Sequence, residues 1–358
     1  MKNKKGGNQN KDVSLDYKFK RINAFLVVLM VVIIAVFFVL RSNGFFSNTC
    51  GDGTFIGNCS EDKPYYCNED HFLTKEADVC RCPGEMNYSE GVCSTDYERG
   101  EIHKSFDYYV HGEEEEVSIF LYQGVEEYVE GISRVYDSTE SDVSLRDIKL
   151  FIINDPIQKN YLMHLVKKIQ NIDRDKTDQA RIAVSIVQRI PYGFSNQSLK
   201  GIFSKEVSYS RYPYEVLYEG KGVCGERSEL LVFLLRELGF GTAIFNFPED
   251  NHQAVGIKCP ISESFDGSEY CFIETTAPSI ISSDKNNYIG RTKFEGDYEI
   301  IPISNGDSLP QGLDEYDDSK TWIKLGKILE EKEELNFFRY YRRRALAEKY
   351  GLNGFGTR

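Results

Sequence analysis

The sequence predicts an α+β protein with one membrane-spanning helix and a small disulfide-rich module ahead of its largest domain. Three observations predict this class. An uninterrupted apolar run covers residues 24–40. Six cysteines fall between residues 50 and 93. Further on, a helical pattern over residues 220–239 is followed by three short apolar segments with the composition of strands.

Shifts in composition along the 358 residues divide the chain into successive parts. A hydrophobic fraction of 41% and an aromatic fraction of 13% are typical of a folded protein. The predicted parts are a basic tail at 1–23, a membrane anchor at 24–40, a cysteine-rich module at 41–98, a large domain at 99–310 and a charged helical segment at 311–358.

The apolar run from Ala24 to Leu40 contains no charged residue, and as a helix it would be about 25 Å long. A cleavable signal peptide is the alternative. No small-residue cleavage site follows Leu40, so the pattern favours an uncleaved signal anchor. Basic residues predominate before the run, which predicts a cytoplasmic N-terminus. We therefore expect a single-pass protein of the plasma membrane with the bulk of its chain outside the cytoplasm.

The formal net charge is −13, and the acidic excess lies after the apolar run. Such a surface repels the phosphates of nucleic acids and of anionic lipid head groups. Nucleic acid is therefore not an expected partner.

All nine cysteines follow the apolar run, as expected in an oxidising compartment. Cys259 and Cys271 flank the loop between two predicted strands, where a disulfide could close the hairpin. With six cysteines in the disulfide-rich module, Cys224 is the odd thiol. Six cysteines allow fifteen pairings, and a zinc site with His71 is the alternative for this module. The six are Cys50, Cys59, Cys67, Cys80, Cys82 and Cys93.

Cys224 stands where a helix is expected to begin. Leucines recur after it at spacings of three and four residues, and Gly239 is a typical residue for the end of a helix. The free backbone N–H groups of a helix N-terminus stabilise a thiolate. The alternative for a single cysteine is a buried structural role.

The three strands that follow carry a histidine and an acid. They are expected at 242–247, at 252–258 beginning with His252, and at 270–276 with Glu274 near the end. A thiol needs a base to act as a nucleophile at neutral pH, and an imidazole needs an acid that fixes its orientation. Cys224, His252 and Glu274 are therefore the candidate catalytic residues.

Several segments together resemble the transglutaminase-like superfamily, most closely its membrane-associated archaeal and bacterial members. The resemblance covers roughly residues 105–303. Its motifs are VQRIPY at 187–192, RYPYEVL at 211–217, GVCGERS at 222–228, HQAVG at 252–256 and IETT at 273–276.

This resemblance implies a papain-like domain at 99–310, in which the helix that carries the nucleophile packs on an antiparallel sheet. It implies that Cys224 is the nucleophile, His252 the base and Glu274 the orienting acid. The chain departs from the family at Val223 and at Glu274, because aspartate is usual at both positions. The disulfide-rich module resembles an EGF-like spacing, which implies the pairs 50–67, 59–80 and 82–93.

Other elements frame this site. A hairpin is expected from strands at 105–110 and 117–122, with the four glutamates that follow Gly112 in its turn. Helices are expected from Pro156 and from about Lys176 to Ile190. Gln188 near the end of the second helix is either a surface residue or an oxyanion donor beside the Cys224 N–H.

Two later segments leave alternatives open. Residues 193–219 are expected to form an irregular loop, whose tyrosines either line a substrate cleft or pack over the helix start. The charged segment after residue 319 is expected to be helical. Its arginine cluster either faces solvent or docks on the acidic body of the protein or near the membrane surface.

The expected activity is acyl transfer through a thioester on Cys224, with a protein or peptide as substrate and either water or an amine as acceptor. The alternative is a non-catalytic surface scaffold on a decayed enzyme fold. No phosphate-binding glycine loop or His-x-x-x-His pattern is present, so neither cofactor nor metal is expected.

Overall fold

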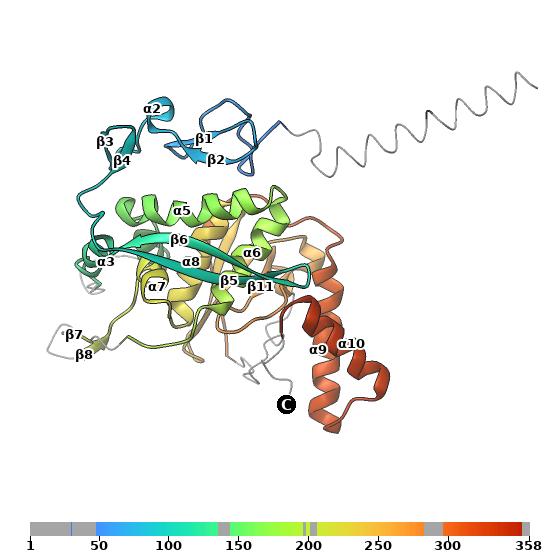
Figure 1. Ribbon diagram of the computed structural model, residues 1–358. Coiled ribbons are helices and arrows are strands. Elements are labelled where there is room, and N and C mark those ends of the chain that lie inside the picture. The colour runs from blue at the N-terminus through green and yellow to red at the C-terminus, as the bar shows by residue number, and fades with distance from the viewer. Residues whose placement is uncertain are drawn as a thin grey trace, which may run out of the picture. The chain divides into compact units, whose positions relative to one another are not determined.

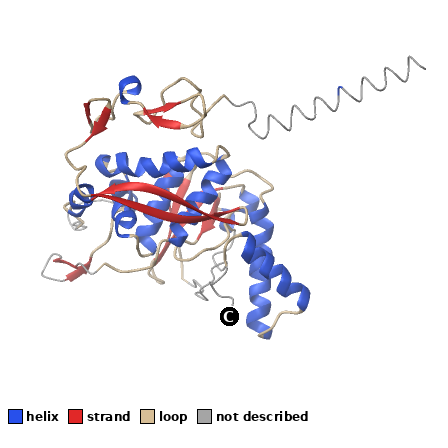
Figure 2. Cartoon of the chain, viewed as in Figure 1, coloured by secondary structure: helices blue, strands red, loops and turns tan. Residues whose placement is uncertain are grey.

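A computed structural model (Figure 1) describes Met30 and residues 48–134, 144–195, 198–200, 206–282 and 296–352. The chain divides into two compact units, Met1–Asn48 and Thr49–Arg358. Every helix and strand named below belongs to the second unit. The α+β class is observed, since helices and antiparallel sheets both contribute to it (Figure 2).

The fold-class prediction needs one correction. The run at 24–40 is at the short end of the roughly 17–25 apolar residues with which a helix crosses a bilayer. Within the described ranges, no helix has the length and apolar character that a crossing requires. The predicted transmembrane helix and single-pass membrane association are therefore not supported. Of residues 24–40, only Met30 lies among the described residues.

The central sheet has four antiparallel strands in the order β11-β10-β9-β12. His252 of β10 lies opposite Phe247 of β9, and Val255 lies opposite Ile273 of β11. Both faces are covered, because the strands alternate between two separate apolar clusters. The strands are β9 (Thr242–Phe247), β10 (His252–Lys258), β11 (Tyr270–Ile273) and β12 (Glu299–Ser304).

Helix α8 (Cys224–Glu237) contacts β9 and β10 and begins at the candidate nucleophile. Its predicted apolar stripe is confirmed, since Leu230, Leu231 and Leu234 are fully buried. Burial of a leucine side chain contributes about 1.5–3 kcal/mol, so this face holds the helix start in a fixed place. The other helices of the large domain are α3 (Gln123–Glu130), α4 (Leu145–Ile153), α5 (Pro156–Ile172), α6 (Lys176–Arg189) and α7 (Pro213–Glu219).

The starts of α5 and α6 follow from their sequences. Asp155 accepts a hydrogen bond from the Gln158 N–H at 2.9 Å, and Pro156 occupies the first helical position. Asp175 caps α6 in the same way by accepting from the Thr177 N–H at 2.8 Å. Both expected helices are thus present.

The loop expected at 193–219 is partly ordered. It contains the short hairpin of β7 (Ser198–Lys200) and β8 (Glu206–Ser208), and then α7. Tyr212 and Tyr214 are almost fully buried, so these tyrosines pack inside the domain and do not line an open cleft.

The hairpin of β5 (Glu101–Val110) and β6 (Glu113–Tyr122) has its turn earlier than predicted. His111 has φ 52° and Gly112 has φ 85°, as in the two-residue turns that fit the twist of hairpins. The four glutamates are therefore in β6, where they are exposed and pair with residues 107–110.

The disulfide-rich module holds short elements joined by disulfides, and contacts α5. Asn171 of α5 pairs with the backbone N–H and C=O of Leu73 at 2.8 and 3.0 Å. The disulfides Cys50–Cys67, Cys59–Cys80 and Cys82–Cys93 are present. The elements are β1 (Tyr65–Cys67), β2 (Leu73–Lys75), α2 (Ala77–Cys80), β3 (Asn87–Ser89) and β4 (Val92–Ser94).

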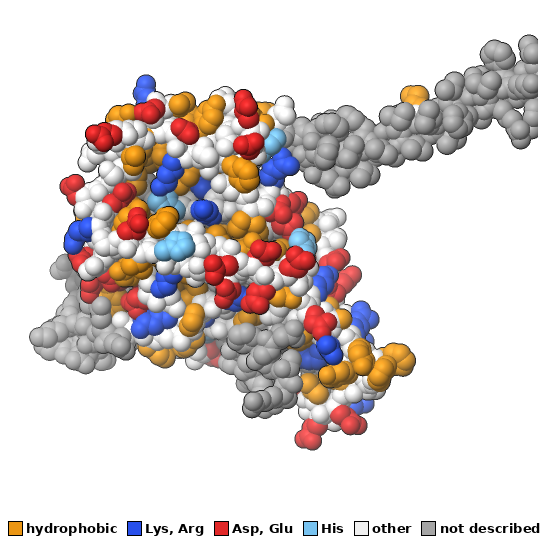
Figure 3. All heavy atoms as spheres, viewed as in Figure 1, with side chains coloured by type: hydrophobic (Ala, Val, Ile, Leu, Met, Phe, Trp, Pro, Cys, Tyr) orange, Lys and Arg blue, Asp and Glu red, His pale blue; other side chains and the backbone are white. Residues whose placement is uncertain are grey.

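Helices α9 (Asp314–Lys332) and α10 (Phe337–Lys349) form the predicted helical tail. They share a small apolar cluster with Ile280, and the Arg343 guanidinium lies 3.9 Å from the ring centroid of Trp322. Hydrophobic side chains also gather on the outer end of this helix pair, at the lower right of Figure 3. Two single-turn helices, Ile261–Glu263 and Phe265–Gly267, lie between β10 and β11.

Candidate active site

The start of α8 is held in place by a buried ion pair. Glu226 accepts hydrogen bonds from the Val223 N–H at 2.9 Å and from the Arg211 N–H at 2.8 Å. The Arg211 guanidinium, which is fully buried, lies 3.0 Å from the same carboxylate. These contacts join the segment at residue 211 to the segment at 222–228. Together they fix the turn that precedes Cys224.

All nine cysteines lie within the described residues, and Cys224 alone is free. Cys259 and Cys271 form the fourth disulfide, which joins the end of β10 to β11. The Cys224 thiol is half-buried and lies 3.9 Å from the Asn251 carbonyl oxygen.

The structure brings His252 and Glu274 to this thiol. The His252 side chain shares a hydrogen bond with Cys224, and its Nε2 lies 2.8 Å from Oε2 of Glu274. The Glu274 side chain is 1% exposed and that of His252 is 13% exposed, so water has little access to the carboxylate. This order of thiol, imidazole and carboxylate is the one that thiol activation requires.

The second oxygen of Glu274 is saturated with donors. Oε1 accepts from the N–H of Thr275 at 3.0 Å, from the N–H of Thr276 at 2.8 Å and from the Thr276 hydroxyl at 2.6 Å. The glutamate therefore reaches the imidazole with one oxygen while its own loop holds the other. This placement compensates for the extra methylene relative to aspartate.

These contacts shift the pKa values of all three groups. Burial alone would raise the pKa of the Cys224 thiol, but the hydrogen bond and charge of His252 lower it below its usual value. Burial alone would lower the pKa of His252, but its contacts with Cys224 and Glu274 raise that pKa to about 9. Burial would raise the pKa of Glu274, which the contacts with His252 and Thr276 lower instead. Both shifts favour a thiolate–imidazolium pair over the uncharged thiol–imidazole pair.

Two backbone N–H groups, which the sequence did not single out, also face the sulfur. Hydrogen bonds from the Gly225 and Gln253 backbones help to lower the pKa of Cys224. Gln253 is positioned by Lys149, which donates to its side-chain oxygen at 3.0 Å and forms a buried ion pair with Glu229. No spacing in the sequence links Lys149 to Gln253, so only the fold shows this support.

Gln188 is neither at the surface nor beside the Cys224 N–H, the two positions that the sequence left open. It is 5% exposed, and its amide nitrogen donates to the Glu274 carbonyl at 2.8 Å and to Ser279 Oγ at 3.1 Å. These contacts occupy the amide, so it does not act as an oxyanion donor in this arrangement. Gln188 instead holds the chain segment that follows the acid.

Other cavities and clusters lie apart from the thiol. A cavity of about 340 Å³ is lined by residues of α6, the segment 279–281 and the C-terminal helices, without Cys224, His252 or Glu274. Among the described residues, no group of three or more His, Cys, Asp or Glu side chains is arranged to hold a metal ion.

Comparisons with known proteins found two solved structures of low similarity. No protein-family model matches the chain, and no curated protein matches its sequence. Calcium-bound LapG of Legionella pneumophila is similar in structure, with a TM-score of 0.27 and 13% identity over 50% of this chain and 98% of that chain. LapG of the same organism gives a TM-score of 0.26 and 13% identity over 46% and 86%. Similarity at this level does not establish a shared fold or function.

Proposed function

We propose that this protein is a transglutaminase-like enzyme that uses Cys224 to transfer acyl groups from amide or peptide bonds. The observation that carries the proposal is the hydrogen-bonded series of Cys224, His252 and buried Glu274, with a lowered thiol pKa and a raised imidazole pKa. Such opposite shifts in neighbouring groups are typical of an activated nucleophile and its acid–base partner.

In the first step, the Cys224 thiolate attacks the carbonyl carbon of the substrate. A C–S bond forms, and the carbonyl electrons move to oxygen; the backbone N–H groups of Gly225 and Gln253, which hydrogen-bond the sulfur, are the donor candidates for this oxygen. When the carbonyl re-forms, the C–N bond breaks, and the leaving amine takes the proton of the His252 imidazolium. The products are a thioester on Cys224, a free amine and a neutral imidazole.

In the second step, His252 takes a proton from the acceptor, whose oxygen or nitrogen attacks the thioester. The C–S bond breaks and the thiolate returns beside the imidazolium. Water as acceptor gives hydrolysis, and a primary amine gives a new amide. Glu274 keeps the ring oriented in both steps because its carboxylate is fixed by three donors from its own loop.

We also propose that the described part of the chain works outside the cytosol. Four disulfides are present, and such bonds persist in oxidising compartments.

Thiol alkylation tests the proposal directly. The full chain, without reductant, is treated with iodoacetamide between pH 5 and 9, and the labelled peptides are mapped by mass spectrometry. We expect Cys224 alone to label and to remain reactive near pH 6, and His252→Ala to move its profile to higher pH. Labelling of Cys224 only near pH 8.5 would refute the enzyme proposal and favour the scaffold alternative. A peptide amide substrate offered with and without a fluorescent primary amine then distinguishes transfer from hydrolysis.

A further inference from the structure

The segment that follows Glu274 is clamped at both ends by one side chain. Gln188 donates to the Glu274 carbonyl at 2.8 Å, and its own oxygen accepts from the Ser279 N–H at 3.2 Å. Its nitrogen also lies 3.1 Å from Ser279 Oγ. A single amide on α6 therefore ties together the first and last residues of the segment 274–279.

That same segment supplies the donors to the Glu274 carboxylate. The N–H groups of Thr275 and Thr276 and the Thr276 hydroxyl all bind Oε1. Arg227 of α8 adds a second support, donating to the Val187 carbonyl at 2.7 Å and to the Thr276 carbonyl at 3.4 Å. The shape of the segment thus sets the position of the carboxylate. Side chains of helices α6 and α8 hold the segment in place.

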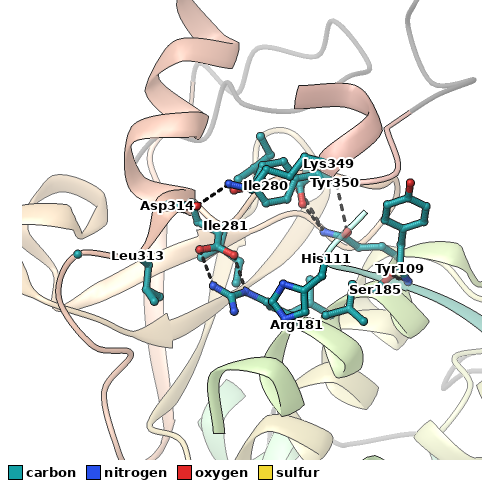
Figure 4. Close-up of a pocket in the computed structure, with 16 residues that line it drawn as sticks. Tyr109, His111, Arg181, Ser185, Ile280, Ile281, Leu313, Asp314, Lys349 and Tyr350 are labelled. Carbon is teal, nitrogen blue, oxygen red and sulfur yellow. Dashed lines mark hydrogen bonds and ion pairs between the residues drawn. The ribbon is translucent and has the colours of Figure 1, made fainter. Parts of the chain in front are cut away.

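Just after Ser279, the chain packs against the C-terminal helices. Ser279, Ile280 and Ile281 line the cavity of about 340 Å³ together with Gln188. Figure 4 shows Ile280 and Ile281 above Arg181 of α6, among the side chains that line this cavity. Ile280 and Ile281 are buried in apolar clusters, so this packing holds the end of the segment while the Gln188 hydrogen bonds tie that end to Glu274.

We propose that Gln188 is a positioning residue, which fixes the Glu274 carboxylate against His252 and thereby sustains the thiolate of Cys224. The inference rests on the proposed function of this site. Gln188 touches neither the thiol nor the imidazole in the contacts described above. It acts through the backbone of Glu274, 86 residues further along the chain.

The test compares two glutamines of the same helix. Gln188→Met keeps the length of the side chain and removes its hydrogen bonds. Gln179→Met is the matched control, since Gln179 is fully buried and donates to the carbonyls of Gly51 and Asp173, both at 2.8 Å. Both variants lose buried amide contacts, but only the first loses contact with the segment that carries the acid. In each full-length variant, the rate of Cys224 alkylation is measured from pH 5 to 9, and the titration of His252 is followed by NMR.

In Gln188→Met, we expect the alkylation midpoint of Cys224 to rise by about one pH unit, so that the rate near pH 6 falls about tenfold. The His252 midpoint falls at the same time. Gln179→Met keeps the profile of the unmodified chain. If Gln188→Met does not fold, Gln188→Leu replaces it, because leucine is also uncharged and lacks the amide donor to the Glu274 carbonyl.

The outcomes separate the two proposals. A low alkylation midpoint in the unmodified chain that persists in the Gln188 variant overturns the positioning role and leaves the proposed function standing. Equal shifts in the Gln188 and Gln179 variants also overturn it, since they indicate general loosening. A midpoint near 8.5 in the unmodified chain overturns the proposed function, and the positioning role with it.

Discussion

The imidazole of His252 lies between a thiol and a carboxylate, and both neighbours act on its proton. Its pKa, raised to about 9, keeps the ring charged at neutral pH, when the amine of a cleaved amide needs a proton. His164 shows the opposite case: burial, together with the charge of Lys75, lowers its pKa to about 3. Two residues of one type thus differ because one has partners for its charge and the other has none that favours it.

We predict that His252 and His164 titrate far apart from each other. Because the folded pKa of His252 lies above the ordinary 6.5, its charge adds stability that is complete below pH 6.5 and is lost as the pH rises through about 9. The imidazole resonances followed by NMR should give midpoints near 9 for His252 and near 3 for His164, assigned with His→Gln variants. A midpoint of His252 near 6.5 would contradict the arrangement.

A second prediction concerns the charge of Glu274. Glu274→Gln keeps the shape of the side chain but removes the charge that stabilises the imidazolium, so the Cys224 thiolate loses its counter-ion. We expect alkylation of Cys224 near pH 6 to slow about tenfold or more, and to approach the unmodified rate at pH 10. The control is Glu263→Gln, which removes a carboxylate whose partner is the exposed Lys320. An unchanged profile in Glu274→Gln would show that the acid does not act on the thiol.

Among the secondary-structure elements, those with strong local patterns were predicted well. The leucine spacing of α8 and the short apolar strands β9, β10 and β11 were found within a few residues of their expected ends. Cys224 begins α8, His252 begins β10 and Glu274 directly follows β11, so the order of these elements along the chain points to the three candidate residues. Short apolar runs and closely spaced leucines indicate burial, which is what these elements have in common.

Elements whose pattern depends on distant partners were missed. Helix α7 lies where the Ser, Gly and Tyr content predicts a loop; its Tyr214 is fully buried, and the helix contacts α5 and α8. The glutamates of β6 were placed in a turn because charge clusters are common there. His111 and Gly112 take the positive φ values instead, which sets the register of the hairpin.

We predict that the centre of the sheet does not tolerate even a methyl group at Gly256 of β10. An added Cβ would lie 2.9 Å from Cε2 of Phe245 and 3.0 Å from Cβ of Tyr270. Gly256→Ala should therefore lower the free energy of unfolding by about 1–3 kcal/mol, measured with urea. The control is Gly84→Ala, where no atom lies within 4 Å of the added group. Equal stability of the two variants would contradict this packing.

Across the whole molecule, the contacts that matter most for the site join residues far apart in sequence. Gln188 reaches Glu274, and Lys149 reaches Gln253, across 86 and 104 positions of the chain. Such pairs leave no periodic signal, so the sequence pointed to Cys224, His252 and Glu274, which lie together in the structure, but not to the contacts that support them. The disulfide pairs in the module are those that its resemblance to an EGF-like module implies.

The last prediction concerns the contact between the disulfide-rich module and α5. Lys167 is 2% exposed and its ammonium lies 2.7 Å from Asp62 and 3.4 Å from Asp52. Lys167→Met leaves the buried Asp52 without its cation, which should cost about 3 kcal/mol of unfolding free energy at neutral pH.

Urea unfolding measures that cost, and hydrogen exchange shows where it falls. We expect faster exchange in residues 50–93, whereas alkylation of Cys224 keeps its pH profile because the site's own contacts are intact. Lys168→Met is the matched control, since the neighbouring lysine is exposed. If the two variants were equally stable, the buried ion pairs of Lys167 would not be what joins the module to the domain. If the pH profile of Cys224 alkylation changed as well, the module would affect the active site through contacts other than those of α5.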